Sequence, residues 1–208
     1  LMASLVEGIE IASAGELVLA QAAGMDPSKI SFAGPGKRDR DLEAAIAAGV
    51  TLNLESEGEA DRALAIGQRI GVQPRLAVRV NPDFDLRGSG MRMGGGAKPF
   101  GIDQDRVPAL VRYILAEGAH WRGFHIFAGS QALDADAIIE TQGKTLDLAA
   151  ALADQVGQLP EHLNLGGGMG IPYFPGDAPV DIAKVGAALS ERFAALPATL
   201  AETHFAME

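Results

Sequence analysis

Residues 162–170 read His-Leu-Asn-Leu-Gly-Gly-Gly-Met-Gly, and this stretch decides the fold class. A short apolar run that ends abruptly in glycines is typical of a buried β-strand followed by a tight turn. Similar runs recur along the chain. Each is followed by a segment in which apolar residues repeat every three or four positions, the pattern of an amphipathic helix. The sequence therefore predicts alternating strands and helices.

Seven strands and six helices are expected from this pattern. Connections through helices make neighbouring strands parallel, and parallel sheets are covered on both faces, which explains why the strands read as apolar runs. The predicted fold class is α/β. The strands are expected at 9–12, 30–33, 51–54, 75–81, 123–127, 162–165 and 204–207, and the helices at 16–23, 39–48, 57–70, 105–116, 135–156 and 182–196.

The ends of the predicted strands favour a closed barrel over an open sheet. Nearly every strand ends in polar or glycine residues, namely Ser13, 34–37, 55–56, 81–82, 129–131 and 166–168. An open sheet needs such residues only at its switch point, whereas a (β/α)8 barrel gathers all its strand ends around one mouth. A complete barrel has eight strands in roughly 250 residues. We therefore expect one incomplete barrel domain over residues 1–208 that lacks one strand.

Composition excludes several classes of protein. The net charge of −10 disfavours nucleic acid and anionic membranes as partners. Without cysteine, the chain holds no disulfide, no thiolate metal site and no cysteine nucleophile. No apolar run is long enough to cross a membrane, and residues 1–8 do not resemble a signal peptide. A cytoplasmic location is the default expectation, and no metal site is expected.

Two segments together suggest a site for a planar ring that carries a phosphate. In 166–168, three residues without Cβ let backbone N–H groups converge on an anion, and the loop after the seventh strand of a barrel is a recurrent phosphate site. A tight turn that needs positive φ is the alternative. In 123–131, Phe127 ends a strand and Ser130 follows on the turn. His125 points to the same side as Phe127, and a hydrogen-bonded core role is favoured over a role as base.

A second glycine-rich stretch, 88–97, lies between the fourth strand and the fourth helix. We expect a flexible loop there. A mobile lid over the barrel mouth is the alternative.

Seven ordered motifs resemble the barrel domain of fold-type III pyridoxal-phosphate amino-acid decarboxylases, the family of diaminopimelate and ornithine decarboxylases with an alanine-racemase-like barrel. The resemblance covers essentially the whole chain and is strongest, in 124–131, to a subgroup linked to exosortase and exopolysaccharide gene clusters. The motifs are Glu-Ile-Ala-Ser-Ala-Gly-Glu-Leu at 10–17, Phe-Ala-Gly-Pro-Gly-Lys at 32–37, Asn-Leu-Glu-Ser-Glu at 53–57, Arg-Val-Asn-Pro at 79–82, Lys-Pro-Phe-Gly-Ile at 98–102, 123–131 and 165–170.

The resemblance implies pyridoxal 5′-phosphate as cofactor, decarboxylation of a small amino-acid or diamino-acid substrate, and a homodimer in the intact enzyme. It implies that Glu208 is catalytic, because its carboxylate keeps the pyridine nitrogen protonated and makes the ring an electron sink. The implied cofactor-binding residues are Glu10, Arg79, Phe127, Ser130, Gly166, Gly167 and Gly168. Two alternatives stay open: a structural ion pair for Arg79, and a plain helix start for Glu16, which also matches an acidic position.

The chain departs from the family in two respects. Phe127 stands where relatives place a His over the ring, so stacking is retained but a hydrogen bond is lost. The Tyr-Ala-x-Lys sequence that carries the Schiff-base lysine is missing, as is the C-terminal β-domain, and none of the five lysines replaces that lysine. We therefore expect these 208 residues to be the core of a longer enzyme and inactive alone.

The sequence leaves two other functions open. One is a racemase or cofactor-homeostasis protein on the same barrel, and the other is a non-catalytic barrel that binds a phosphorylated ligand. The resemblance leaves diaminopimelate, ornithine, lysine, arginine and carboxynorspermidine open as substrates.

Overall fold

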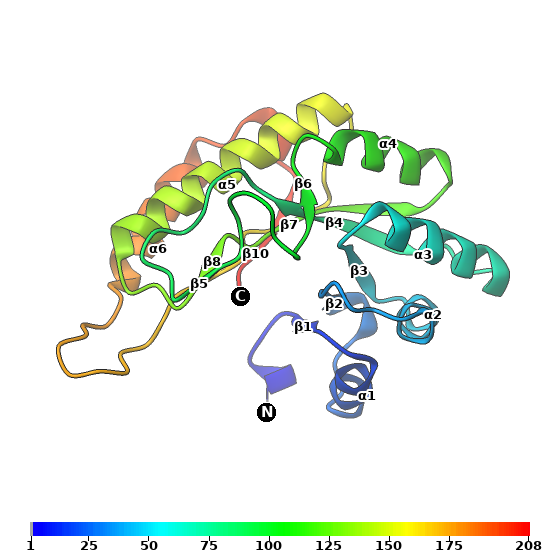
Figure 1. Cartoon of the computed structure of the whole chain (residues 1–208), viewed down its shortest axis with the longest axis horizontal. Helices are drawn as coiled ribbons and strands as arrows, with labels where there is room; N and C mark the ends of the chain where they lie inside the picture. The colour runs from blue at the N-terminus through cyan, green and yellow to red at the C-terminus, as the bar shows by residue number, and fades with distance from the viewer. Residues whose placement is uncertain (1) are drawn as a thin grey trace.

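The computed structural model describes residues 2–208, and its main sheet is a parallel sheet bent into part of a barrel (Figure 1). The strands along the sheet are β1 (Ile9–Ile11), β2 (Ile30–Phe32), β3 (Thr51–Leu54), β4 (Arg75–Asn81), β7 (His120–Ile126), β9 (His162–Asn164) and β10 (His204–Ala206). Every neighbouring pair on this path is parallel. In the described part of the chain β1 and β10 do not pair, so the barrel is open between them.

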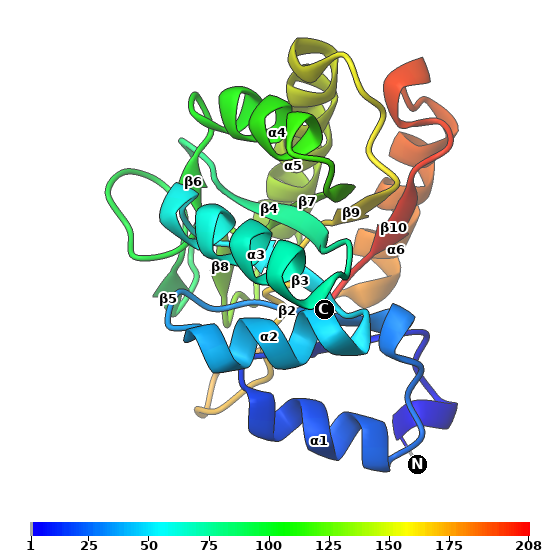
Figure 2. The ribbon, with the colours of Figure 1, turned by 90° about the vertical axis from the view of Figure 1, so that its right-hand side faces the viewer.

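Six helices cover the outside of the sheet, and Figure 2 shows α1 to α4 stacked side by side. Serine and aspartate side chains cap the N-termini of four of them, and glycines in the left-handed region end three, as expected for helix boundaries. The helices are α1 (Ala14–Ala22), α2 (Asp39–Ala48), α3 (Glu57–Ile70), α4 (Val107–Ala116), α5 (Ala135–Val156) and α6 (Ile182–Ala194). Short 3-10 turns lie at Met2–Ser4, Pro27–Lys29 and Ala198–Leu200.

The predicted α/β barrel class is confirmed, and each predicted strand and helix is present. Three short strands were not predicted: β5 (Met91–Arg92), β6 (Ile102–Asp103) and β8 (Gly129–Ser130). Segments of two residues are too short to show a period. β5 pairs with β8 in an antiparallel ladder, so the glycine-rich loop expected at 88–97 is held against the turn that follows β7.

Two hydrophobic cores stabilise this arrangement. The larger lies between the sheet and the helices and includes fully buried Leu42, Leu52, Leu76 and Ile126. The smaller contains Leu86, Ala128, Ala132, Ile138 and Val185, and it packs the loop after β4 against α5 and α6. The second core therefore anchors a loop that has almost no secondary structure of its own.

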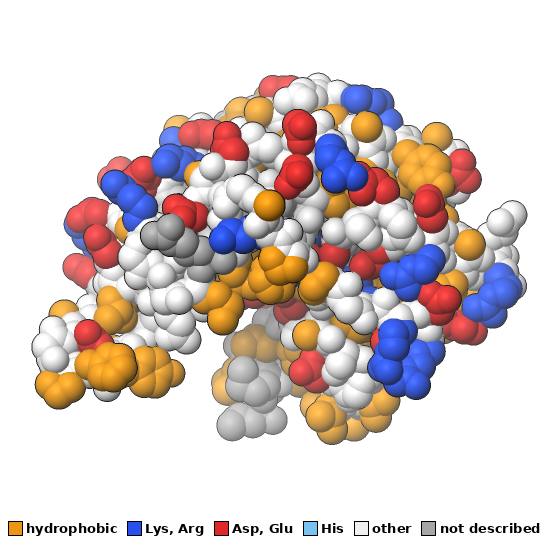
Figure 3. All heavy atoms as spheres, in the orientation of Figure 1, with side chains coloured by type: hydrophobic (Ala, Val, Ile, Leu, Met, Phe, Trp, Pro, Cys, Tyr) orange, Lys and Arg blue, Asp and Glu red, His pale blue; other side chains and the backbone are white. Residues whose placement is uncertain are grey.

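The loop between β9 and α6 projects from the body of the molecule (Figure 1). Its side chains Ile171, Tyr173 and Phe174 are exposed, and Figure 3 shows hydrophobic atoms gathered there. None of the helices in the described residues is both long and apolar enough to cross a membrane.

Gly123 in β7 offers a test of how tightly the strands are packed. Its φ is 131°, and a Cβ there would collide with the carbonyl oxygen of His162 on β9. We expect Gly123→Ala to lower the free energy of unfolding by at least about 2 kcal/mol, because the backbone strain at positive φ adds to the steric overlap with His162. Urea denaturation measures this change. Gly186→Ala on exposed α6, where nothing lies within 4 Å, is the control and should be neutral or stabilising by up to about 1 kcal/mol. Equal stability of the two variants would contradict the packing argument.

Candidate functional site

The carboxyl ends of the strands bring polar side chains together on the inside of the curved sheet. Arg79 of β4 pairs in register with His125 of β7, which pairs with Asn164 of β9. Glu10 comes from β1, on the other side of the opening, and Glu208 follows β10. The polar atoms of Glu10, His125 and Glu208 lie within 4.8 Å of one another. We call these three residues the carboxylate–histidine cluster.

His125 lies between the two carboxylates of this cluster. Its side chain is 1% exposed, and its Nε2 is 2.9 Å from Oε1 of Glu208. Its Nδ1 is 3.9 Å from Oε2 of Glu10. The sequence favoured a core role for His125, and its burial agrees, but its contacts are with site residues. His125 therefore belongs to the candidate site, and its position two residues before Phe127 on the same side of the strand was the signal for this.

Glu208 is placed so that it stays ionised. The Nδ2 of Asn164 donates a hydrogen bond to Oε1 of Glu208 at 2.9 Å. Burial raises the pKa of Glu208, but the close contact and charge of His125, with the hydrogen bond of Asn164 and the charge of Arg79, outweigh it and lower the pKa below its usual value. The surroundings of Glu208 therefore favour its negatively charged form, and its predicted catalytic role stays a prediction.

Glu10 behaves in the opposite way. Its Oε2 accepts hydrogen bonds from Oγ of Ser31 at 3.0 Å and from Nδ2 of Asn53 at 3.2 Å. Burial is the largest influence and raises the pKa of Glu10, while His125 lowers it less and the charge of Glu208 raises it further. The two carboxyl groups of one cluster thus have different proton affinities, which is typical of functional sites.

Arg79 takes part in a buried ion pair. Its Nη1 is 2.9 Å from Oε1 of Glu55, and its guanidinium lies over the ring of Phe100 at 5.0 Å from the centroid. The same carboxylate accepts the N–H of Gly34 at 2.6 Å and the N–H of Gly101 at 2.7 Å. The structural ion pair left open by the sequence is therefore present. Glu55 was quoted only as part of a motif, and its partners could not be foreseen from spacing.

The glycine turn after β9 is both a tight turn that needs positive φ and a segment with free backbone N–H groups. Gly166 and Gly168 have φ values of 69° and 89°, so the turn needs residues that tolerate the left-handed region. A Cβ at Gly167 would collide with the carbonyl oxygen of Glu208, and one at Gly168 with that of Gly129. The glycine turn therefore packs between the end of β10 and the turn that contains Ser130.

The N–H groups of this turn are available for an anion. The N–H of Gly166 is used by Oδ1 of Asn164 at 2.8 Å. Within residues 2–208, the N–H groups of Gly167, Gly168 and Met169 have no hydrogen-bond partner. Consecutive free N–H groups in a glycine turn are the donors from which backbone nests for phosphate are built. The residues present therefore fit the phosphate group that the sequence resemblance implied.

Phe127 lies beside this turn, as expected. A Cβ at Gly166 would lie 3.0 Å from Cδ2 of Phe127, and the Phe127 ring is 6.4 Å from the ring of His125, edge to face.

Glu16 is not part of the carboxylate–histidine cluster. Its Oε2 accepts the N–H of Ala12 at 2.5 Å across the start of α1, which favours the helix-start interpretation.

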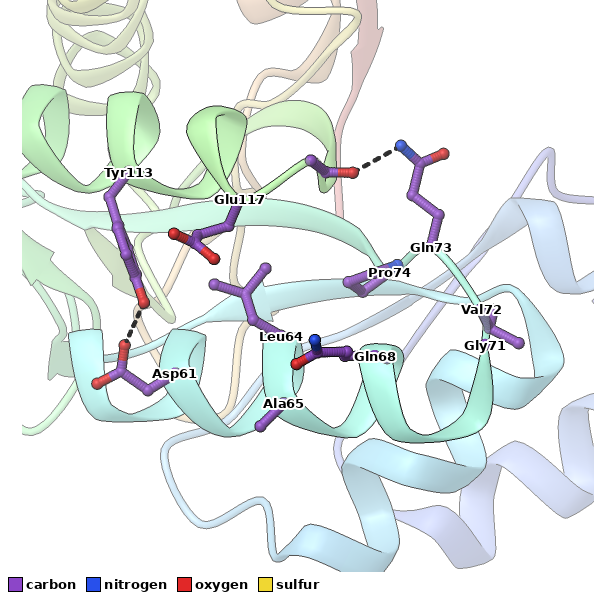
Figure 4. A pocket seen from close by; sticks show the side chains of 12 residues that line it. Asp61, Leu64, Ala65, Gln68, Gly71, Val72, Gln73, Pro74, Tyr113 and Glu117 are labelled. Carbon is purple, nitrogen blue, oxygen red and sulfur yellow. Dashed lines mark hydrogen bonds between the residues drawn. The ribbon is translucent and has the colours of Figure 1, made fainter.

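A groove of about 540 Å³ lies elsewhere, between α3 and α4 on the outside of the sheet (Figure 4). The hydroxyl of Tyr113 donates to Asp61 at 2.9 Å, and Nε2 of Gln73 donates to the carbonyl of Gly118 at 2.8 Å. The groove shares no residue with the carboxylate–histidine cluster. Its size alone gives no chemistry, so the cluster and the glycine turn form the candidate site.

Comparison with known proteins identifies the family of this site. Residues 1–208 match the family model described as "Pyridoxal-dependent decarboxylase, pyridoxal binding domain". The chain belongs to this family. The match confirms the resemblance stated from the sequence, and it confirms pyridoxal phosphate as the cofactor of the family.

Relatives and solved structures agree with this assignment. The chain is 35% identical over 186 residues to the L-glutamyl-[BtrI acyl-carrier protein] decarboxylase of Niallia circulans, covering 88% of this chain and 44% of that protein. It is 36% identical to the diaminopimelate decarboxylase of Aquifex aeolicus, covering 88% and 45%. The diaminopimelate decarboxylase of Helicobacter pylori complexed with L-lysine superposes with a TM-score of 0.85 at 26% identity, over 100% of this chain and 52% of that one. The chain spans about half the length of these relatives.

The lysine in the turn after β2 is tied into the fold. Lys37 and Glu59 are 4% and 1% exposed, and Nζ of Lys37 lies 2.8 Å from Oε1 of Glu59. The same ammonium donates to the carbonyl oxygens of Gly34 at 2.6 Å and Asn53 at 2.9 Å. Two hydrogen bonds and an ion pair thus hold the ammonium of Lys37 inside the fold, which agrees with the expectation that it is not the reactive lysine.

We expect Lys37→Met to lower the free energy of unfolding by about 3–5 kcal/mol, because it leaves the Glu59 carboxylate buried without a partner. The double variant Lys37→Met/Glu59→Leu should recover most of this loss. Arg69→Met, which breaks an exposed pair with Glu43, is the control and should cost less than about 1 kcal/mol. Urea denaturation at neutral pH measures all three. A double variant no more stable than Lys37→Met would be inconsistent with an ion pair as the cause.

Proposed function

We propose that residues 1–208 form the cofactor-binding barrel domain of an enzyme that decarboxylates an amino acid with pyridoxal 5′-phosphate. The observation that carries this proposal is the pairing of two features at the ends of the neighbouring strands β9 and β10. One is the run of free N–H groups from Gly167 to Met169, and the other is the low-pKa carboxylate of Glu208. The first suits the phosphate of the cofactor and the second suits its protonated ring nitrogen.

The phosphate end is assigned to the glycine turn and Ser130. Gly168 contacts Gly129, which directly precedes Ser130, so the hydroxyl and the free N–H groups come from touching turns. Glycine at 166–168 both permits the positive φ angles and lets the backbone approach the anion closely. A dianionic phosphate held by several N–H donors fixes the position of the whole cofactor.

The ring end is assigned to Phe127 and Glu208. Phe127 offers an aromatic face at the mouth without any hydrogen-bonding group, so its contribution is stacking alone. Glu208 holds a proton on the pyridine nitrogen through charge attraction, and His125 and Asn164 hold the carboxylate in place. When bound, the cofactor supplies an electron sink for the negative charge that remains after CO2 leaves.

Glu10 and Arg79 complete the surroundings of Glu208. Because the pKa of Glu10 is raised by burial, Glu10 holds its proton more readily than an ordinary carboxyl group and adds less negative charge beside Glu208. Arg79 is neutralised by Glu55 but still lowers the pKa of Glu208. Both effects favour a negative charge on Glu208, beside the position proposed for the ring nitrogen.

The substrate class follows from relatives of known activity. These act on diaminopimelate or on a glutamyl group carried by an acyl-carrier protein, so we propose an amino-acid substrate that loses its α-carboxylate.

On the basis of the resemblance, we also propose that the full-length protein is a cytoplasmic homodimer. Since none of the five lysines matches the Schiff-base position, we propose that residues 1–208 alone hold the cofactor without covalent attachment and do not turn over.

Activity of the full-length protein tests the proposed function. We expect pyridoxal-phosphate-dependent CO2 release from a diamino acid or a carrier-bound amino acid, and Glu208→Gln should lower kcat on the order of 10²-fold or more, because it removes a charge aimed at the reacting ring. Asp177→Asn, in the projecting loop after β9, is the control and should leave kcat unchanged. Tight cofactor binding without CO2 release from any such substrate would favour the non-catalytic binding barrel instead.

The pH dependence of cofactor affinity tests the role given to His125. Its contact with Glu208 favours the ionised carboxylate, so His125→Leu should raise the pKa of Glu208. As pH falls, the variant carboxylate takes up its proton earlier, and pyridoxal phosphate affinity should decline at a higher pH than in the wild type. His125→Gln keeps a donor at this position and should move the profile less. Fluorescence titrations between about pH 4 and 7 measure this, and superimposable profiles would refute the role.

A further inference from the structure

The loop after β4 contacts both turns of the proposed phosphate end. Leu86 is 2% exposed in the smaller hydrophobic core. A Cβ at Gly129 would lie 2.9 Å from Cβ of Leu86, and a Cβ at Gly168 would lie 2.9 Å from Cδ2 of the same side chain. Leu86 therefore sits against the turn that carries Ser130 and against the glycine turn, and it fixes their spacing.

Ser89, three residues further along, is next to the same turn. A Cβ at Gly129 would lie 2.9 Å from Oγ of Ser89. The N–H of Ser89 donates to the carbonyl of Leu86 at 3.3 Å, so a short turn connects the two residues. Two residues beyond Ser89, Met91 of β5 pairs with Ser130 of β8. The segment is thus fixed on both sides of Ser89.

The hydroxyl of Ser89 is buried and has no hydrogen-bond partner within residues 2–208. Leaving a buried hydroxyl unpaired is costly, so such a group calls for a partner that comes from outside the chain. The hydroxyl lies beside Gly129, and Gly129 in turn touches Gly168. The hydroxyl therefore lies close to the turns that form the proposed phosphate end.

We propose that Ser89 donates a hydrogen bond to the phosphate of the cofactor, with Leu86 as the positioning residue that sets the width of the site. This inference rests on the proposed function, and it adds a third segment to the two turns already assigned. The glycine-rich loop then has a binding role, and the absence of a side chain at Gly129 is explained, because any Cβ there would displace Ser89 and Leu86.

The test compares two ligands that differ only in the phosphate. Dissociation constants for pyridoxal 5′-phosphate and for pyridoxal are measured by fluorescence titration of the full-length protein. Ser89→Ala should weaken pyridoxal 5′-phosphate binding roughly 5- to 20-fold and leave pyridoxal binding unchanged, because only one ligand uses the hydroxyl. Ser130→Ala should show the same selectivity. Ser190→Ala, whose hydroxyl bonds its own helix on α6, should affect neither ligand.

The outcomes separate this inference from the proposed function. If the wild type prefers the phosphorylated ligand and Ser89→Ala keeps the full preference, or weakens both ligands equally, the role of Ser89 is refuted and the proposed function stands. If the wild type shows no preference, both fail. A change in the ³¹P resonance of bound cofactor in Ser89→Ala, absent in Ser190→Ala, gives a second readout that a general loss of stability does not produce.

Discussion

The carboxylate of Glu55 joins the loops around the mouth of the barrel, and the rest of the site depends on this one group. It accepts the guanidinium of Arg79 and the N–H groups of Gly34 and Gly101, so it links the ends of β2, β3 and β4 with the strand segment that begins at Ile102. A buried charge is tolerated only where partners satisfy it. Here the partners come from different loops, and the need to pair the charge fixes the loops relative to one another.

The same principle explains the carboxylate–histidine cluster. Two carboxyl groups so close together would repel each other if both were ionised without compensation. His125 and Asn164 stabilise the charge on Glu208, whereas hydroxyl and amide donors serve Glu10, whose burial favours its neutral form. The difference in pKa between Glu10 and Glu208 therefore comes from the residues around them, which are polar side chains on strands that otherwise read as apolar.

The fold was predictable because short apolar runs alternate with helices that are long enough to show a period. α5, with 22 residues, and β4, with seven, have clear patterns, whereas β5, β6 and β8 have two residues each and none. The residues of the glycine turn and Glu208 could be singled out through motifs. The grouping of Glu10, His125 and Glu208 could not, because β1, β7 and β10 are not neighbours in the sheet and their residues meet only when the sheet curves. Spacing along the chain carries no record of that curvature.

The glycine turn and the end of β10 are joined by more than proximity. The N–H of Glu208 donates to the carbonyl of Gly166 at 2.9 Å, and Gly167 rests on the Glu208 backbone. The groups proposed to bind opposite ends of the cofactor therefore lie at the ends of two adjacent, hydrogen-bonded strands, which fixes the distance between them. Insertions in the outer loops can change the space for a substrate without changing this distance. Substrate specificity can therefore diverge on this domain while the size of the cofactor that it accepts is preserved.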